Sequence, residues 1–126
     1  MKRLLRSYWP TVAVGFAILY LSISTGESLP KIPLFANADK VVHFLMYAGL
    51  TFTLTWAMRE RGKSLISTAL WAILIASAFG GLMEIIQPYF PPRTGDILDF
   101  IADAAGAGCS FIITDILWQR INCSTK

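Results

Sequence analysis

Long stretches without charged residues constrain this chain more than any other feature. Residues 7–26, 41–58 and 64–83 contain no Lys, Arg, Asp or Glu. Each run is close to the ~20 residues that a helix needs to cross the hydrocarbon core of a bilayer. Soluble domains carry charged residues at roughly a quarter of their positions, whereas this chain has 15% and a mean hydropathy of +0.55. The sequence therefore predicts membrane-spanning helices rather than a soluble core.

A fourth apolar segment, residues 97–118, is interrupted by acidic residues near its start. Asp96, Asp99 and Asp103 are spaced i, i+3 and i+7, which places them on one face of a helix. A carboxylate at bilayer depth is costly, so such residues usually face a protein interior and mark function. This segment is therefore expected to span the membrane with Asp99 and Asp103 pointing into a helix bundle.

These segments predict an all-α membrane protein, a four-transmembrane-helix bundle with both termini in the cytoplasm. The expected helices lie near residues 8–25, 41–58, 64–87 and 97–118. They are expected to form a single domain over residues 1–126. The first run follows basic residues, as a signal peptide does, but it is long and lacks a good cleavage site, so a retained helix is expected. Cys109 and Cys123 are expected to be structural or incidental, because a reducing compartment disfavours a disulfide.

The distribution of Lys and Arg predicts the orientation. Eight of the eleven basic residues precede the first segment, lie between the second and third, or follow the fourth. The other three, Lys31, Lys40 and Arg93, fall in the opposite connections. Since cytoplasmic loops carry the excess of Lys and Arg, both termini are expected in the cytoplasm. Basic anchors at the cytoplasmic face also account for the net charge of +3 without a nucleic-acid partner.

This topology brings polar residues from three helix ends and two loops to the outer face. The predicted polar pocket consists of Asp39, Lys40, His43, Tyr47, Glu84, Gln87, Arg93, Asp96, Asp99 and Asp103. Asp39, His43 and Tyr47 recur every four residues, so Asp39 is expected to orient the ring of His43. Tyr47 and Gln87 are expected to support the pocket as hydrogen-bonding residues.

A helix cap and close helix contacts are predicted near the polar pocket. Asp96 precedes the fourth helix and is expected to cap it. Gly80, Gly81, Gly106 and Gly108 are expected to let neighbouring helices approach closely, because they lack a side chain.

The carboxylates leave three chemical interpretations open. Up to five acids, Asp39 included, face only Lys40 and Arg93 in the predicted pocket. One interpretation is a divalent cation, with His43, Glu84, Asp96 and Asp99 as candidate ligands through imidazole and carboxylate groups. Another is a lipid-phosphate site in which Arg93 clamps the anion, and the third is a structural hydrogen-bonded network. No nucleophile–base pair is visible, so catalytic residues are not assigned and enzyme activity stays open.

Three motifs in order resemble the signature of the VanZ-like family. They are Asp39-Lys40-Val41-Val42-His43-Phe44 followed by Tyr47, Glu84-Ile85-Ile86-Gln87, and Arg93-Thr94-Gly95-Asp96-Ile97-Leu98-Asp99 followed by Gly106. Position 103 departs from the family pattern, which often has Asn where this chain has Asp103. The resemblance implies a small multi-pass protein of the bacterial cytoplasmic (inner) membrane that is associated with the cell envelope. Through the name-giving member it also implies a link to low-level resistance to the glycopeptide antibiotic teicoplanin, without a settled mechanism.

The leading functional hypothesis is an envelope-associated protein whose outward-facing pocket binds or acts on a lipid-linked or anionic envelope molecule. Its expected partners are membrane lipids and a lipid-linked envelope precursor. The first alternative is a small transporter or channel subunit that uses the acidic stripe as a proton or cation path. A bundle this small would need a homo-oligomer to conduct, and the acids are confined to the outer half. The second alternative is a structural subunit of a membrane complex.

The predicted orientation is testable with topology reporters. We expect a reporter fused after Lys126 to register as cytoplasmic, and one inserted within residues 27–40 to register as external, because basic residues are retained on the cytoplasmic side. Alkaline phosphatase, which is active only outside the cytoplasm, distinguishes the two. An active phosphatase at the C-terminus would contradict the orientation.

Overall fold

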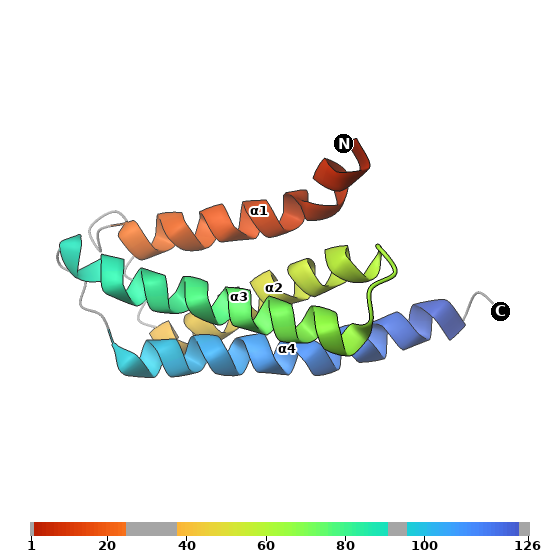
Figure 1. Cartoon of the computed structure of the whole chain (residues 1–126). Helices are drawn as coiled ribbons and strands as arrows, with labels where there is room; N and C mark the ends of the chain where they lie inside the picture. The colour runs from red at the N-terminus through yellow and green to blue at the C-terminus, as the bar shows by residue number, and fades with distance from the viewer. Residues whose placement is uncertain (1, 25–37, 91–95, 124–126) are drawn as a thin grey trace.

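A computed structural model of the chain describes residues 2–24, 38–90 and 96–123 (Figure 1). Its four α-helices are α1 (Lys2–Ile23), α2 (Ala38–Arg59), α3 (Leu65–Ile86) and α4 (Ile97–Cys123), and a short 3-10 helix, η1 (Gln87–Tyr89), follows α3. No strand occurs within these three described ranges. The predicted all-α, four-helix class is therefore confirmed.

Three of the helical segments are long and apolar enough to cross a membrane, namely Asp39–Arg59, Leu65–Tyr89 and Ile97–Ile121. The apolar part of α1, Ser7–Ile23, is shorter, at the lower limit of the length that can span. Large apolar side chains cover the outside of the helices, as a lipid environment requires. The chain is thus a multi-pass membrane protein with three long apolar helices, and α1 carries a shorter apolar segment.

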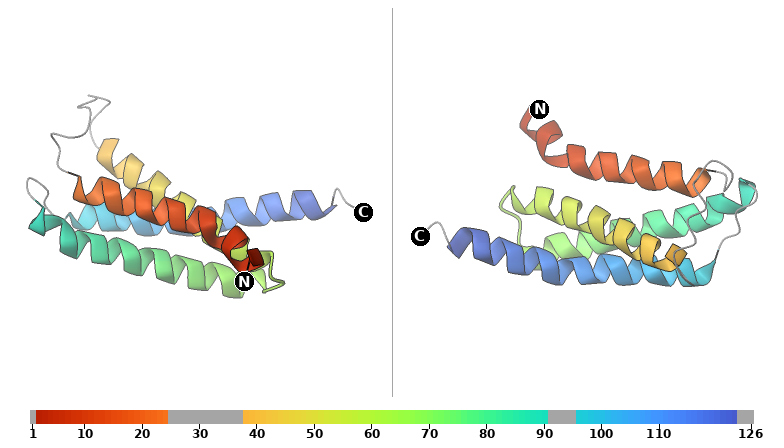
Figure 2. Two further views of the ribbon diagram at one scale, coloured as in Figure 1. Left: turned by 90° about the horizontal axis from the view of Figure 1, so that it is seen from above. Right: turned by 180° about the vertical axis from the view of Figure 1, so that it is seen from behind.

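The helices alternate in direction, so the bundle has two distinct ends (Figures 1 and 2). The start of α2, the end of α3 and the start of α4 lie together at one end, which we call the acidic end because it carries Glu84, Asp96 and Asp99. The start of α1, the end of α4 and the α2–α3 turn lie at the other end. The most extensive contact joins α2 to α4, whereas α1 packs against α2 on the side away from α4.

The close α2–α4 contact depends on a glycine. A Cβ atom added at Gly106 would overlap the backbone carbonyl of Phe44 on α2. Small and hydroxyl-bearing side chains continue this contact, and Thr51, Thr55, Ala107, Ser110 and Thr114 are all buried. Small residues let membrane helices approach until their backbones touch. The two helices that carry most of the polar residues are therefore held at very short range.

The four glycines expected at helix contacts do not behave alike. Besides Gly106, Gly80 of α3 is tightly enclosed, with a side-chain oxygen of Asp103 2.9 Å from a Cβ built there. Gly81 has ordinary contact distances to the ring of Phe100. The expectation is wrong for Gly108, since a Cβ there would meet nothing within 4 Å. Gly108 lies two residues after Gly106 and so faces another side of α4.

Two helices extend past their predicted bounds at the end of the bundle opposite the acidic end. α1 begins at Lys2 rather than near residue 8, and α4 continues to Cys123 rather than ending near residue 118. Charged and amide side chains such as Arg and Gln are good helix formers, so the helices continue past the apolar stretch. Between α2 and α3, Gly62 adopts a φ of 73° in the turn, and the hydroxyl of Ser64 accepts a hydrogen bond from the Ser67 N–H at 3.3 Å as the cap of α3.

A matched pair of glycine substitutions tests the α2–α4 contact. Gly106→Ala should lower the free energy of unfolding by about 1–3 kcal/mol, because the new methyl group overlaps the Phe44 carbonyl and forces the helices apart. Gly108→Ala should be neutral or stabilising by up to about 1 kcal/mol, because it adds helix propensity in open space. Equilibrium unfolding in mixed detergent micelles measures both. Equal effects at the two positions would contradict the contact.

Candidate functional site

Polar side chains from three helices meet inside the acidic end. α2 contributes Lys40 and His43, α3 contributes Glu84, and α4 with its cap contributes Asp96, Asp99 and Asp103, and we call these six residues the acidic cluster. His43, Asp99 and Asp103 are buried. Because buried charges are costly unless they are paired, the contacts within the cluster determine what it can do.

Lys40 ties the first turn of α2 to the start of α4. Its ammonium group lies 2.9 Å from a carboxylate oxygen of Asp96 and 2.9 Å from Oδ1 of Asp99. A third carboxylate, that of Asp39, lies 3.4 Å away. Lys40 is therefore shared among three acids, and the cluster keeps more negative than positive groups.

His43 pairs with Asp103 across the close α2–α4 contact. The distance from Nδ1 to Oδ1 of Asp103 is 3.0 Å, and Asp103 is completely buried. The expectation that Asp39 orients the ring is therefore wrong. Asp39 belongs to the first turn of α2, its side chain is 58% exposed, and it contacts Lys40 instead. The partner of His43 comes from another helix because the short α2–α4 distance brings that carboxylate within reach.

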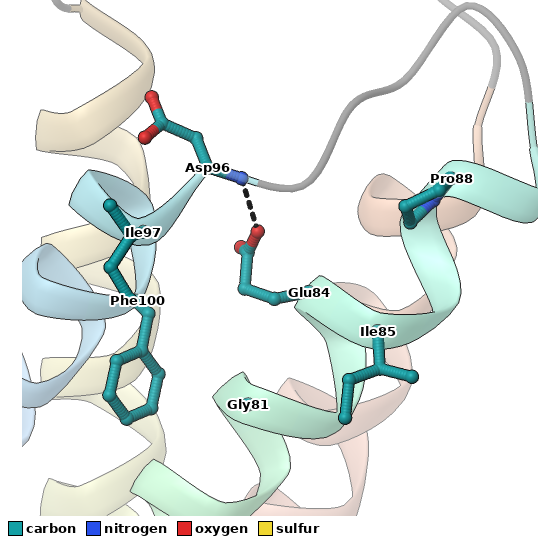
Figure 3. A pocket seen from close by; sticks show the side chains of 7 residues that line it. All are labelled: Gly81, Glu84, Ile85, Pro88, Asp96, Ile97 and Phe100. Atoms are coloured by element: carbon teal, nitrogen blue, oxygen red, sulfur yellow. Dashed lines mark hydrogen bonds between the residues drawn. The ribbon is translucent and has the colours of Figure 1, made fainter.

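The start of α4 is joined to α3 through its cap. The Leu98 N–H donates to Oδ1 of Asp96 at 2.9 Å, which confirms Asp96 as the N-cap. The Asp96 N–H in turn donates to Oε2 of Glu84 at 2.7 Å (Figure 3). The bond from Leu98, followed by the Lys40 ammonium, holds the pKa of Asp96 below its usual range. Asp96 is therefore ionised at neutral pH.

Three members of the acidic cluster form a set that could hold a metal ion. His43, Glu84 and Asp99 each offer one ligand atom, and these atoms all lie within 4.8 Å of one another. Asp96, the fourth candidate ligand, lies outside this set because its carboxylate caps α4 and contacts Lys40. The structure thus groups an imidazole with two carboxylates taken from three different helices.

A pocket of about 480 Å³ opens beside the acidic cluster between α3 and α4. Its lining comprises Gly81, Glu84, Ile85, Pro88, Asp96, Ile97 and Phe100, and we call it the α3–α4 groove. In Figure 3, Glu84 and Asp96 meet at one end, while Ile85 and Gly81 line the α3 side and Phe100 the α4 side. The groove is therefore apolar along its walls and acidic at the end next to the cluster.

The remaining residues of the predicted pocket are Tyr47, Gln87 and Arg93. Tyr47 and Gln87 are buried, but the Tyr47 hydroxyl and Gln87 Nε2 have no hydrogen-bond partner among the described residues. Their role as hydrogen-bonding supports therefore stays a prediction. The ring of Tyr47 instead packs 6.4 Å from Phe79, centroid to centroid. Arg93 lies outside the described residues.

Sequence reasoning missed a column of buried hydroxyl groups that continues from the acidic cluster. Thr51 and Thr55 extend the four-residue spacing of His43 and Tyr47 along α2, and all of them are buried. Ser110 is buried on the facing helix α4. The signal was present as a polar residue at every fourth position of an otherwise apolar segment. Hydroxyl residues are common in apolar helices, so the spacing alone does not identify a buried column. The burial of these side chains in the structure does.

The His43–Asp103 pair can be tested against a second acid of the same helix. Asp103→Ala should lower the free energy of unfolding by about 1.5–3 kcal/mol, since it removes a charged partner from a buried ring. Asp115→Ala should change it by less than about 0.5 kcal/mol, because Asp115 accepts a bond from Gln119 at an exposed site. Unfolding of both variants in mixed micelles measures the difference. Similar losses would show that the pair contributes no more than a surface contact.

A family model and a yeast protein are similar to this chain. The VanZ/LLP1 family model matches residues 4–118, a range that contains every member of the acidic cluster. The uncharacterized protein C11E3.10 of Schizosaccharomyces pombe is 29% identical over 113 residues, which cover 86% of this chain and 65% of the yeast protein. The chain thus spans less than two thirds of that relative. No solved structure matches the chain. Because the family model covers nearly the whole membrane bundle, the chain belongs to the VanZ/LLP1 family.

Proposed function

We propose that this protein lies in the bacterial cytoplasmic membrane with its acidic end outward, and that it binds a lipid-linked or anionic molecule of the cell envelope. The observation that carries the proposal is the α3–α4 groove. Its walls are apolar along Ile85, Ile97 and Phe100, and its polar end is formed by Glu84 and Asp96. A groove of this composition suits an amphiphile.

The position of the groove favours a ligand that arrives from the bilayer. Ile85 and Ile97 are 67% and 69% exposed, so they stand on the lipid-facing surface of the bundle. A hydrocarbon chain can contact these side chains while its head group reaches the acidic cluster. A volume of about 480 Å³ lies within the usual range of about 300–1,000 Å³ for ligand pockets.

The charge of the acidic cluster restricts the head group. Among the described residues, four carboxylates of the cluster face the single ammonium of Lys40, which already contacts two of them. A phosphate would be repelled by the remaining negative charge. An anionic head group therefore requires a cation between itself and the carboxylates.

The bacterial location and the link to glycopeptides rest on resemblance and on charge. The VanZ-like motifs support an association with low-level teicoplanin resistance, and the excess of basic residues at the opposite end supports an outward acidic end. The S. pombe relative is eukaryotic, so membership of the family alone does not identify the membrane. These elements belong to the proposal together with the ligand class.

A proton path is a second candidate, supported by the buried hydroxyl column. Among the described residues, the hydroxyl groups of Thr51, Thr55 and Ser110 are buried without hydrogen-bond partners. The column extends the polar interior beyond the acidic cluster. The buried carboxylates, Asp99 and Asp103, nevertheless lie in the first two turns of α4, so no buried acid among the described residues continues the path. This candidate therefore ranks below lipid binding.

Filling the α3–α4 groove tests the proposed function. Gly81→Leu places a side chain in the groove and should weaken binding of a polyprenyl phosphate by about tenfold, equivalent to about 1.4 kcal/mol. Gly108→Leu adds the same side chain to α4, where a Cβ meets nothing within 4 Å, and should leave binding unchanged. Native mass spectrometry of protein in nanodiscs, in buffer with Mg²⁺ and Zn²⁺, measures both.

The outcomes separate groove binding from unspecific contact with lipid. Equal binding by Gly81→Leu, Gly108→Leu and the unaltered chain would contradict the groove, and absence of binding by the unaltered chain would contradict the ligand class. In a bacterium that expresses the three proteins at equal levels, Gly81→Leu should raise teicoplanin tolerance less than the other two.

A further inference from the structure

The inner surface of the acidic cluster has the composition of a transition-metal site. His43, Glu84 and Asp99 offer ligand atoms within 4.8 Å of one another, and His43 Nε2 lies 3.8 Å from Oδ2 of Asp99. Ligands about 2.0–2.1 Å from a tetrahedral Zn²⁺ lie about 3.3 Å apart. Small side-chain rotations would therefore bring these atoms to coordination distance.

Each of the three ligands is already oriented by a second contact. Nδ1 of His43 lies 3.0 Å from Asp103, and with its proton on Nδ1 the ring keeps a lone pair on Nε2. Metal-binding histidines are commonly oriented in this way by a carboxylate. Oδ1 of Asp99 accepts from Lys40 at 2.9 Å, which leaves Oδ2 facing His43.

Glu84 shows the same division between its two oxygens. Oε2 accepts the N–H of Asp96 at 2.7 Å, whereas Oε1 is buried and has no hydrogen-bond partner among the described residues. An unpartnered carboxylate oxygen in a buried position is costly. A bound cation would satisfy it.

A separate observation comes from Tyr47, one turn further along α2 from His43. Tyr47 is 1% exposed, and its hydroxyl is buried without a partner among the described residues. The Tyr47 ring lies beside the Asp103 carboxylate, since a Cβ built at Gly80 would meet Cε1 of Tyr47 at 3.2 Å and Oδ2 of Asp103 at 2.9 Å. A buried hydroxyl group without a hydrogen-bond partner is costly. An ion bound in the acidic cluster with its coordinating water would supply a partner for the Tyr47 hydroxyl.

We propose that His43, Glu84 and Asp99 bind a divalent transition metal, with Asp103 orienting His43 and a coordination position left for water or ligand. One imidazole and two carboxylates suit Zn²⁺ or Mn²⁺ better than Mg²⁺ or Ca²⁺, which prefer oxygen ligands alone. The metal site rests on its own geometry. Its role as the cation between the carboxylates and an anionic head group rests on the proposed function.

The single histidine of the chain allows a test without any substitution of a ligand. In protein produced without a polyhistidine tag and selectively labelled at His43, Zn²⁺ should shift the ring nitrogen signals at an equimolar ratio. Nε2 should take the shift of a metal-bound nitrogen while Nδ1 keeps its proton. Cys109 and Cys123 are replaced by Ser in every sample, because thiolates also bind Zn²⁺. Ring signals unchanged by Zn²⁺ would overturn the site.

Substitutions then identify the other ligands. His43→Ala, Glu84→Gln and Asp99→Asn should each weaken Zn²⁺ binding by at least about tenfold, and Asp103→Asn by roughly 10–100-fold as expected for an orienting residue. Asp115→Asn, an acid at the far end of α4, should bind as tightly as the parent. Isothermal titration with Zn²⁺ measures these affinities, and parent-like binding by Glu84→Gln and Asp99→Asn would overturn the assignment.

These measurements distinguish a failure of the metal site from a failure of the proposed function. Zinc bound at His43 without polyprenyl phosphate binding contradicts the proposed function and leaves the metal site intact. Polyprenyl phosphate bound in excess EDTA as tightly as in Zn²⁺ contradicts the bridging role. A variant that does not insert into the membrane leaves the His43 signals of the parent protein as the decisive measurement.

Discussion

The burial of the Asp103 carboxylate inside a membrane bundle is the constraint on which the rest of this structure depends. A charge at that depth is tolerated only when a partner lies within hydrogen-bond distance, and here the partner is His43 at 3.0 Å. The two residues belong to different helices, so α2 and α4 must lie very close together. Gly106 makes this possible, because its missing side chain leaves space for the backbone of Phe44.

That close contact organises the acidic end around it. With α2 and α4 in place, Lys40 reaches Asp96 and Asp99, and the N–H of Asp96 reaches Glu84 on α3. Three helices are thus joined at one level by polar contacts, while most of the outer surface is apolar. The polar contacts on the inner side and the α3–α4 groove on the lipid side share Glu84 and Asp96. This shared boundary would connect the proposed metal site with the proposed lipid ligand.

Much of the fold could be predicted from the sequence, because charge-free runs and helix caps act locally. The four helices and the N-cap at Asp96 are examples. The pairing of His43 with Asp39 was predicted wrongly for the same reason: a four-residue spacing identifies neighbours on one helix but says nothing of a closer partner on another. Gly108 was misassigned because two glycines that are two positions apart look alike in sequence but face different sides of a helix.

The sequence by itself determined that this chain is a helical membrane protein with an acidic face at the start of its last helix, since hydropathy and periodicity are properties of each segment alone. Only the tertiary structure decided which acid orients His43, which oxygen of Glu84 remains without a partner among the described residues, and where the groove opens. These features depend on distances and rotations between helices. They follow from how side chains of α2, α3 and α4 fit together, and no single segment carries that information.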